Sequence, residues 1–339
     1  MIVTTHATEQ EWDAFVEQSG EATGYHLWRW RRVMERAFGH RTLYLAARDG
    51  DAIVGVLPTV IMKSWLFGRS LVSLPFVNYG GVIAVNEDVR RALLDSAAAI
   101  ASEEQVTHVE LRHLVRRFDD LPVKQHKVTM LLRLAANEAD AWTALDRKVR
   151  NQIKKAQKSG LTVENGGSEL LGDFYAVFAE NMRDLGTPVY SRRFFEEVLA
   201  VFPATARVFV ARLAGAPVAA AITYGFRETL EVPWASALRS SRPLCANTLL
   251  YWHVMLHAIA EGRSTFDFGR STPGDGPFQF KRQWGAEPSP LSWEYRLLKG
   301  DVPNVSPTNP KFQMAIAMWK RLPVPVATWL GPSIVRSIP

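Results

Sequence analysis

The chain has 339 residues, of which 47% are hydrophobic and 22% are charged. This composition is typical of a globular protein and excludes disordered and fibrous chains, and the length favours two domains over one. Forty Lys and Arg residues against 34 Asp and Glu residues give a net charge of +6, which favours anionic partners. The single cysteine, Cys245, excludes a disulfide framework and a Cys-rich zinc site. No apolar run is long enough to span a membrane and the first residues do not resemble a signal peptide, so we expect a cytoplasmic protein.

The first half of the chain is predicted to begin with helices and to continue with strands. Thr8 and Glu11 form a capping box for a helix that ends near Gln18, and a second helix is predicted over 27–38. Apolar runs on both sides of Asp49-Gly50-Asp51 predict an antiparallel hairpin. The remaining predicted elements are strands over 71–74 and 82–85, a helix over 87–102, and strands over 106–111 and 128–134.

The second half repeats this layout, although the two halves share little sequence identity. Aligning Gly50 with Gly215 superimposes Leu45 on Val210 within the two hairpins. The predicted elements are helices over 140–159, 170–185 and 192–201, strands over 208–213, 217–222 and 229–234, a helix over 247–261, a strand over 265–268, a helical turn over 278–284 and a strand over 292–298. We therefore expect an α+β protein with two similar domains, 1–135 and 136–300, and a site in or beside the groove between them.

The densest positive charge lies in residues 147–158 of the predicted helix over 140–159, and this segment holds six cations. Val149, Ile153 and Ala156 form its apolar stripe. Lys148, Lys155 and Lys158 lie off that stripe, while Arg147, Arg150 and Lys154 follow one another at i, i+3 and i+7. Like charges at this spacing repel each other, so a bound anion would stabilise the helix. The alternative is an ordinary solvated basic surface.

A second candidate site follows the strand over 265–268. Alternation along a strand places Asp267 on the face opposite its two phenylalanine neighbours, and Arg270 and Ser271 lead into a Gly- and Pro-rich loop. Loops that follow strands of a rigid scaffold often carry functional residues. Asp267 is a candidate general base or orienting group, and the alternative is a structural acid paired with Arg270.

The helical turn that comes next carries Phe280, Lys281 and Trp284. If the turn is helical, the two aromatic side chains share a face and anchor it, so that Lys281 points elsewhere. A lysine fixed in this way is well suited to stabilise an oxyanion or to bind a phosphate. The alternative is an ordinary lysine on a packed turn. His253 and His257 are spaced as metal ligands, but the glutamate that a zinc protease needs between them is missing, so we expect no metal site.

Four segments together resemble the FemAB-like branch of the GNAT acyltransferase superfamily. They are residues 148–160, the Gly186-Thr187-Pro188 loop, Asp267-Phe268-Gly269-Arg270-Ser271, and Phe280-Lys281-x-x-Trp284-Gly285. A fifth segment, residues 72–81, is similar to the FemAB-related proteins associated with exosortase/PEP-CTERM exopolysaccharide systems. The resemblance covers roughly residues 25–300.

The resemblance implies two tandem GNAT-like domains, each a mixed sheet flanked by helices, and an acyltransferase that transfers an acetyl or aminoacyl group. The implied donor is acyl-CoA or aminoacyl-tRNA, and the implied acceptor is an anionic or lipid-linked saccharide precursor of the cell envelope or of an exopolysaccharide. By motif, Phe280 and Lys281 lie at the reaction centre, and Arg150 and Lys154 hold a substrate phosphate or carboxylate. Tyr190, Arg270, Ser271 and Trp284 are predicted to line the substrate site.

Two departures from the family patterns affect the donor. The segment Arg242–Asn247 lacks the glycines with which GNAT enzymes bind the pyrophosphate of CoA, although Asn247 could cap the next helix and contribute there. No long coiled-coil arm of the Fem type is present either. The alternative hypothesis is therefore a non-catalytic, degenerate GNAT fold that binds a glycan precursor or an assembly partner.

The tail, residues 301–339, begins as a Pro-rich linker and continues with apolar residues at helical spacing beside Lys and Arg. This pattern favours contact of residues 309–339 with the inner face of a membrane. Packing of the tail against the first domain is the alternative.

Overall fold

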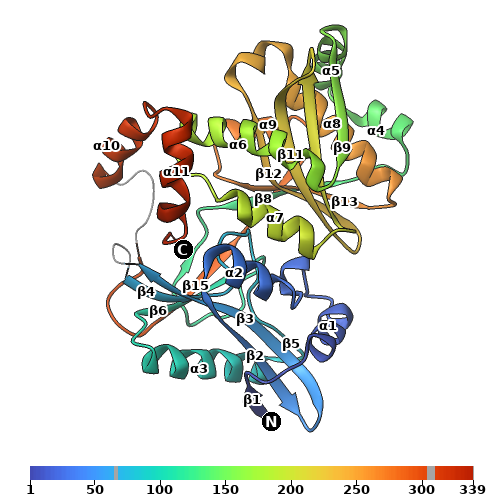
Figure 1. Cartoon of the computed structure of the whole chain (residues 1–339). Helices are drawn as coiled ribbons and strands as arrows, with labels where there is room; N and C mark the ends of the chain where they lie inside the picture. Colours follow the sequence, from blue (N-terminus) through green and yellow to red (C-terminus); the bar gives the residue numbers. More distant parts are fainter. Residues whose placement is uncertain (65–67, 304–309, 339) are drawn as a thin grey trace. The chain divides into compact units, whose positions relative to one another are not determined.

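The computed structural model describes residues 1–64, 68–303 and 310–338, and its chain divides into two compact units. The first unit contains residues 1–126, 290–305 and 336–339, and the second contains residues 127–289 and 306–335. Each unit is built on its own mixed sheet with helices on both faces (Figure 1). The fold class is α+β, as predicted.

The sheet of the first unit has the strand order β1-β2-β3-β4-β6-β15-β7, with β5 paired to β3. Its strands are β1 Ile2–Thr4, β2 Arg41–Asp49, β3 Ala52–Ser64, β4 Gly68–Val72, β5 Ile83–Ala84, β6 His108–His113, β7 Val123–Lys124 and β15 Ser292–Leu297. The predicted hairpin is β2-β3. The pair β4 and β6 is parallel, since the helix α3, Glu87–Glu103, connects the two strands.

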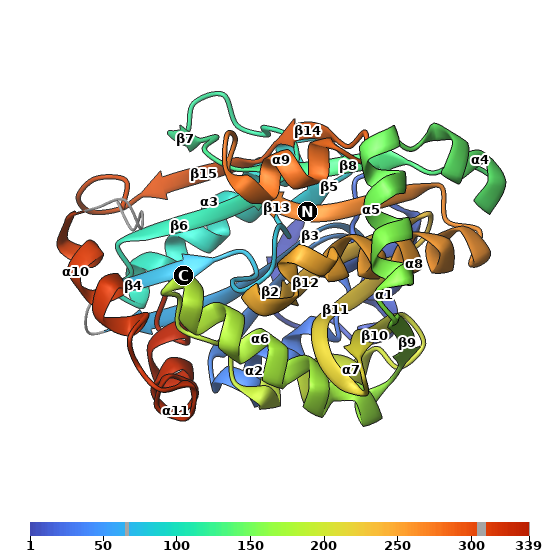
Figure 2. The same cartoon turned by 90° about the horizontal axis from the view of Figure 1, so that it is seen from above.

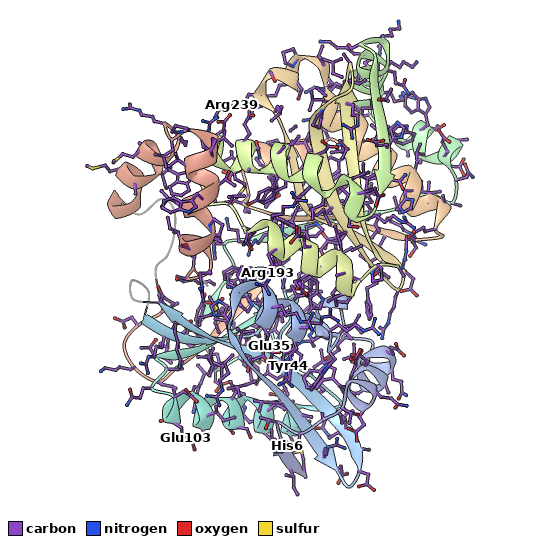
Figure 3. All side chains as sticks on the ribbon, in the orientation of Figure 1. His6, Glu35, Tyr44, Glu103, Arg193 and Arg239 are labelled. Atoms are coloured by element: carbon purple, nitrogen blue, oxygen red, sulfur yellow. The ribbon has the colours of Figure 1, made fainter. Side chains whose placement is uncertain are left out.

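Helices cover both faces of this sheet. α3 packs over a core that includes Leu57, Leu93 and Leu111. On the other face, α2, Trp30–Phe38, packs against β2. This packing brings Glu35 of α2 close to Tyr44 of β2 (Figure 3). α1, Glu9–Gln18, begins with the predicted capping box of Thr8 and Glu11. The second helix begins at Trp30 instead of Leu27, because residues 24–26 form a separate 3-10 turn.

The sheet of the second unit has the order β14-β8-β13-β12-β11-β10-β9. Its strands are β8 Val128–Arg133, β9 Leu161–Gly166, β10 Ala206–Leu213, β11 Ala216–Phe226, β12 Thr229–Ala237, β13 Thr265–Ser271 and β14 Glu287–Pro290. The predicted second hairpin is β10-β11. Here too the parallel pair, β12 and β13, is connected by a helix, α8, Ala246–Ala260.

The helices of the second unit form a layer on each face of its sheet (Figure 2). α8 and α5, Arg147–Lys158, pack with α4, Glu138–Ala144, over one core. α6, Leu171–Leu185, and α7, Arg192–Val201, pack against the strands β10 to β12. The predicted continuous helix over 140–159 is interrupted, because Leu145 ends α4 and the Asp146 carboxylate caps α5 by accepting from the Lys148 amide at 2.6 Å.

One strand lies in a different sheet from the one that the sequence suggested. Ser292–Leu297 was predicted to belong to the second domain, but it pairs along its whole length with β6 of the first unit. The strand β8, in turn, pairs with β13 of the second unit. The two halves of the chain thus exchange a strand: β8, which follows β7, joins the sheet of the second unit, and β15, which follows β14, joins the sheet of the first unit.

The tail forms two short helices, α10, Pro310–Trp319, and α11, Val324–Val335. α11 packs on α6 of the second unit, so the alternative that the tail packs against the first domain holds only for its end, where His40 Nε2 donates to the Arg336 carbonyl at 2.9 Å within the first unit. Among the helices that the structure describes, none has both the length and the apolar character needed to cross a bilayer.

Candidate active site

The strand β13 points a carboxylate away from the core. Phe266 and Phe268 are buried beneath α8, so alternation places Asp267 on the opposite face, as predicted. Asp267 is only 1% exposed. Its Oδ1 accepts hydrogen bonds from Thr129 Oγ1 at 2.5 Å and from the Gly269 amide at 2.7 Å. The carboxylate is thus held in one orientation within β13.

A second buried acid lies beside Asp267. Glu231 on β12 is its partner in the parallel register and is 4% exposed. Neighbouring residues in register point to the same face of a sheet, so the two carboxylates are adjacent. A cation close to both would be stabilised by their charge.

That cation is supplied by α9, Gly276–Arg282. Phe280 and Trp284 pack against Tyr251 with ring centroids 5.3 and 6.4 Å apart, so they anchor this short helix as predicted. Lys281 is 7% exposed, and its Nζ donates hydrogen bonds to the carbonyl oxygens of Gly269 at 2.9 Å and Arg270 at 3.1 Å.

The protonation of Lys281 is set by opposing effects. Burial lowers the pKa of Lys281 from 10.5 to about 8, while the negative charges of Asp267 and Glu231 raise it. The nearby guanidinium of Arg270 lowers the same pKa further. A lysine with a pKa near 8 can change its protonation state close to neutral pH, as acid–base and oxyanion-stabilising groups do.

Two polar residues at this site come from β8 and its start, and sequence reasoning missed both. Thr129 donates to Asp267, and Lys127 Nζ donates to Thr272 Oγ1 at 2.5 Å. Burial and the charge of Arg270 lower the pKa of Lys127. Arg270 therefore lies close to both lysines. No local motif marks Lys127 or Thr129, because a register between distant strands brings them here.

Ser271 lies at the end of the same strand. It is 5% exposed, and its Oγ has no hydrogen-bond partner among the described residues. A buried hydroxyl without a hydrogen-bond partner lowers the stability of the fold unless a ligand or a water molecule supplies the hydrogen bond. Of the predicted site residues, Asp267, Arg270 and Ser271 lie on β13 and Lys281 lies on α9, whereas Phe280 and Trp284 pack into the core on the face of the sheet opposite Asp267.

The basic helix α5 lies elsewhere. Its apolar stripe packs in the core beneath α8, over the face of the sheet opposite Asp267. Lys154 is exposed, with Nζ 5.8 Å from the ring centroid of Trp142, and Arg150 is half-buried. Neither has a contact with Lys281 in the described part of the chain. The expected grouping of Arg150 and Lys154 with Lys281 is therefore not seen.

Different cations of α5 line an open pocket. They are Arg147, Lys148 and Lys155, and the same pocket is bounded by Cys245 at the start of α8. The prediction that Asn247 caps this helix is wrong, because α8 begins at Ala246 and Cys245 occupies the N-cap position in a left-handed conformation with φ +60°.

Tyr190 lies on the loop before α7. Its ring packs on Phe194, with centroids 5.2 Å apart, and its carbonyl accepts a hydrogen bond from the Tyr175 hydroxyl at 2.9 Å. Within residues 1–64, 68–303 and 310–338, no group of three or more His, Cys, Asp or Glu side chains is arranged to hold a metal ion. His257 Nε2 instead lies 3.1 Å from Oε1 of Glu261 on the same helix.

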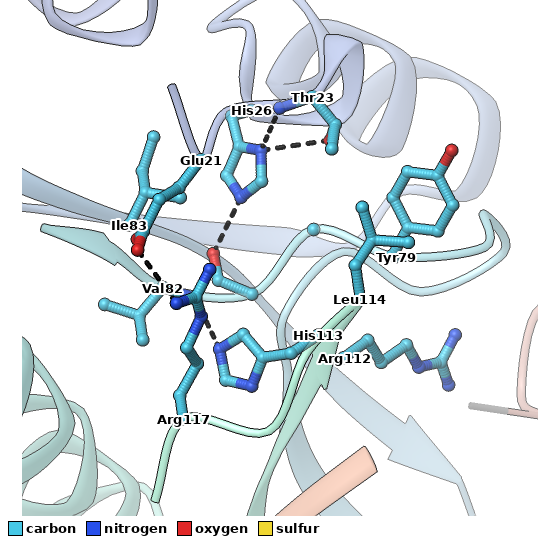
Figure 4. Close-up of a pocket in the computed structure, with 12 residues that line it drawn as sticks. Glu21, Thr23, His26, Tyr79, Val82, Ile83, Arg112, His113, Leu114 and Arg117 are labelled. Atoms are coloured by element: carbon cyan, nitrogen blue, oxygen red, sulfur yellow. Dashed lines mark hydrogen bonds and ion pairs between the residues drawn. The ribbon is translucent and has the colours of Figure 1, made fainter. Parts of the chain in front are cut away.

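The first unit contains a polar pocket of its own, which the sequence analysis did not place among the candidate sites (Figure 4). Two histidines hold the loop that borders it. His26 accepts from the Thr23 amide at 3.0 Å through Nδ1, so its Nε2 donates to the Gly81 carbonyl at 3.0 Å. His113 Nε2 accepts from the Val82 amide at 2.9 Å. Burial lowers the pKa of both histidines, and that of His26 to about 4, so His26 is neutral at pH 7.

Glycine is required at one position of this loop. A Cβ at Gly81 would lie 1.9 Å from the His113 ring, which no side chain can do. Across the pocket Arg117 pairs with Glu21 at 2.8 Å. The pair Gly80-Gly81 in the segment quoted for the family resemblance was the available sequence signal for this pocket.

Comparison with known proteins identifies the domain that carries Asp267 and Lys281. Residues 144–282 match the family of acetyltransferase (GNAT) domains. The second unit therefore carries a GNAT acyltransferase domain. It is similar to FemAB-type proteins, since the chain is 25% identical over 204 residues to the lipid II:glycine glycyltransferase of Staphylococcus aureus strain MRSA252. That match covers 53% of this chain and 47% of the relative, so the chain spans about half the length of the curated relatives it matches.

Solved structures extend the likeness of fold to both units. The crystal structure of FemX has a TM-score of 0.65 at 16% identity, covering 86% of this chain and 97% of that one. The structure of L-PGS from Bacillus licheniformis has a TM-score of 0.58 at 14% identity and covers 98% of this chain and 97% of that one. Both units of this chain thus have a fold similar to that of these two proteins.

Proposed function

We propose that the protein is an acyltransferase whose reaction centre is the buried Lys281 beside Asp267. The observation that carries the proposal is the placement of Lys281, 7% exposed and bound to two backbone carbonyls, in a domain that matches the GNAT family. An ammonium group has three N–H donors, and two are used here. The third has no partner among the described residues and is available for a substrate oxygen.

The chemistry that this arrangement supports is attack of a nucleophile on an acyl carbonyl. The lone pair of an acceptor amine or hydroxyl forms a bond to the carbonyl carbon, and the π electrons move to the oxygen. Lys281 stabilises this oxyanion with its remaining N–H. Collapse of the intermediate breaks the bond to the leaving group, which takes up the proton that the acceptor loses. Asp267 accepts or orients that proton as the candidate base.

The pocket between α5 and the start of α8 is the candidate binding site for an anionic part of the donor. Arg147, Lys148 and Lys155 line it. Phosphates of acyl-CoA or of the acceptor end of an aminoacyl-tRNA match this charge. The matched relatives are named for glycyl transfer, which favours the aminoacyl donor, and so does the absence of glycine between Arg242 and Asn247.

For the acceptor, we propose an anionic, lipid-linked saccharide precursor of the cell envelope or of an exopolysaccharide. The cations Lys127 and Arg270 beside Lys281 favour an anionic group close to the reacting atoms. A relative named for lipid II supports a lipid-linked acceptor. Such an acceptor would bring the protein to a membrane surface.

The first experiment identifies the donor. Thermal unfolding is measured with acyl-CoAs, aminoacyl-tRNAs and nucleotide sugars, since a ligand at a hundred times its Kd stabilises the folded state by about 2.7 kcal/mol. Transfer from the stabilising donor is then followed with Lys281→Ala. Removal of one oxyanion donor should lower turnover by about 10²-fold or more.

The matched control is Arg282→Ala, because Arg282 is the exposed neighbour of Lys281 on the same helix. It should transfer at the wild-type rate. Unchanged turnover in Lys281→Ala would remove this lysine from the mechanism. Ligand binding without transfer by the wild type would instead support the alternative of a non-catalytic binding fold.

A further inference from the structure

The tail of the chain carries an unusual combination of charge and apolar surface. Residues 302–339 contain four cations and no Asp or Glu. Over this range the helices α10 and α11 have high mean hydropathy, unlike the basic helix α5. Soluble surface helices normally place charged residues of both signs on their outer side. The outer side of these helices therefore needs a separate explanation.

The inner side of the tail is packed firmly on the second unit. α11 buries Ala327, Gly331 and Val335, and a Cβ at Gly331 would lie 2.8 Å from the backbone nitrogen of Val189. The turn between the two helices is held by Arg183, whose Nη1 donates to the Leu322 carbonyl at 2.8 Å.

The helix α10 is fixed at the loop after α6. Gly186 has φ +80°, and a Cβ there would lie 2.6 Å from the Ile316 side chain and 2.9 Å from that of Lys320. The pair of helices, in red, accordingly lies beside α6 in Figures 1 and 2. The contacts with the second unit thus fix which side of α10 and α11 faces outward.

That outer side is apolar. Met314 and Met318, one helical turn apart on α10, are 75% and 66% exposed, and Trp329 on α11 is 78% exposed. Of the eleven large apolar side chains exposed among the described residues, five lie on these two helices, and they are Met314, Met318, Val326, Trp329 and Ile334. A concentration of this kind marks an interaction surface.

Charge decides which partner fits. Lys320 and Arg321 are exposed at the end of α10, next to this apolar side, and no acid lies within residues 302–339. Apolar side chains with an exposed tryptophan, flanked by cations alone, are the features of helices that lie in the interface of an anionic bilayer. With 10 and 12 residues, α10 and α11 are suited to lie on the membrane and are too short to cross it.

We propose that α10 and α11 form a docking surface for an anionic lipid bilayer, with Met314, Met318 and Trp329 inserted among the acyl chains and Lys320 and Arg321 at the headgroups. The inference deepens the proposed function, because it names the surface through which the enzyme meets the membrane that holds a lipid-linked acceptor. The residues of this surface are distinct from Asp267 and Lys281, which are proposed to carry the reaction.

The test is flotation of the full chain with vesicles of phosphatidylcholine alone or with 30% phosphatidylglycerol, about a third of the lipid being anionic. Wild type should float with the anionic vesicles, and less so at high salt. Lys320→Gln with Arg321→Gln should weaken partitioning about fivefold for each cation removed. The variant Met314→Ser, Met318→Ser, Trp329→Ser should stay in the soluble fraction.

Two controls separate this result from unfolding and from the reaction. Val85→Ser with Val115→Ser removes exposed apolar side chains of the first unit, 62% and 60% exposed, and should float as wild type does. Lys281→Ala should also float, even if it no longer transfers an acyl group. Equal flotation of wild type and the triple variant, with the triple variant folded, would overturn the proposal. A second outcome would also overturn it: the wild type does not float and is a dimer in gel filtration, while the triple variant is a monomer. The surface would then bind a second copy of the protein and not a membrane.

Discussion

Each unit holds a buried carboxylate at its parallel strand pair, Glu294 on β15 beside that pair in the first unit and Asp267 on β13 within it in the second, and the two acids have different surroundings. In the first unit Glu294 is fully buried and accepts from His113 Nδ1 at 2.5 Å and from the amides of Arg117 and Phe118. All of these donors are fixed parts of the fold. In the second unit Asp267 shares its surroundings with an ionisable lysine whose pKa is about 8.

The source of that difference is one element. After β13 the chain forms α9, which carries Lys281, whereas after β6 no helix precedes β7. The first unit thus holds an acid whose hydrogen-bond donors are a histidine and two backbone amides, and the second unit holds an acid beside a titratable lysine. The strand layout that the two units share does not by itself bring a titratable lysine to the acid, whereas α9 does so in the second unit.

The largest effect that this comparison predicts is on stability in the first unit. Glu294→Ala leaves His113 Nδ1, the buried Phe118 amide and the part-buried Arg117 amide without an acceptor, and because each unsatisfied buried donor costs about 1–3 kcal/mol, the free energy of unfolding should fall by about 3–5 kcal/mol. Calorimetry should show a fall in Tm of about 10 °C. The exposed Glu9→Ala serves as the control, with little change. A loss as small as that of the control would contradict the structural role of Glu294.

An effect of intermediate size concerns the pH dependence of Lys281. Its pKa is about 8 in the folded state against 10.5 for the ordinary group, so the unfolded chain binds more protons between these values. At pH values below about 8, burial of the ammonium therefore makes the free energy of unfolding smaller. This loss of stability decreases as the pH rises from about 8 to 10.5. Relative to wild type, Lys281→Met should be more stable at pH 7, and urea denaturation should show the gap narrowing at alkaline pH.

The same titration distinguishes two roles of the lysine. If the ammonium stabilises an oxyanion, turnover should fall above about pH 8, whereas turnover that rises through this range would identify Lys281 as a base. A stability gap that is independent of pH would show that Lys281 is not buried as an ammonium.

The smallest expected change in stability is that of Asp267→Asn. The amide oxygen of asparagine can still accept from Thr129 and Gly269, so the free energy of unfolding should change much less than in Glu294→Ala. Loss of the negative charge should lower the pKa of Lys281 further, because the charge of Asp267 raises it. The alkaline limb of the activity profile should therefore move to lower pH. A limb that stays in place would show that Asp267 does not act through this lysine.

The sequence predicted best what short-range contacts determine. The capping box of Thr8 and Glu11 and the anchoring of α9 by Phe280 and Trp284 depend on neighbours in the chain, and both were predicted. The break at Leu145–Asp146 is also local, but a favourable helical pattern on both sides obscured it. The expectation for Asn247 failed because Cys245 adopts the left-handed conformation at which the helix begins.

Long-range pairing could not be predicted in this way. Lys127 and Thr129 approach Asp267 only through the register of β8 with β13. Nothing within Ser292–Leu297 distinguishes one sheet from the other as its partner. The candidate site was therefore half visible in the sequence, with the residues of β13 and α9 predicted and those of β8 missed.

The exchange of β8 and β15 has a consequence for how the protein is made. During translation the sheet of the second unit is complete once β14 ends at Pro290, while β6 still lacks β15. An open strand edge can pair with other chains. The nascent first unit should thus need protection on the ribosome until β15 emerges. If the gene is cut between residues 135 and 136, the first fragment lacks β15 and carries β8 without its partner β13, and the second fragment lacks β8 and carries β15 without its partner β6.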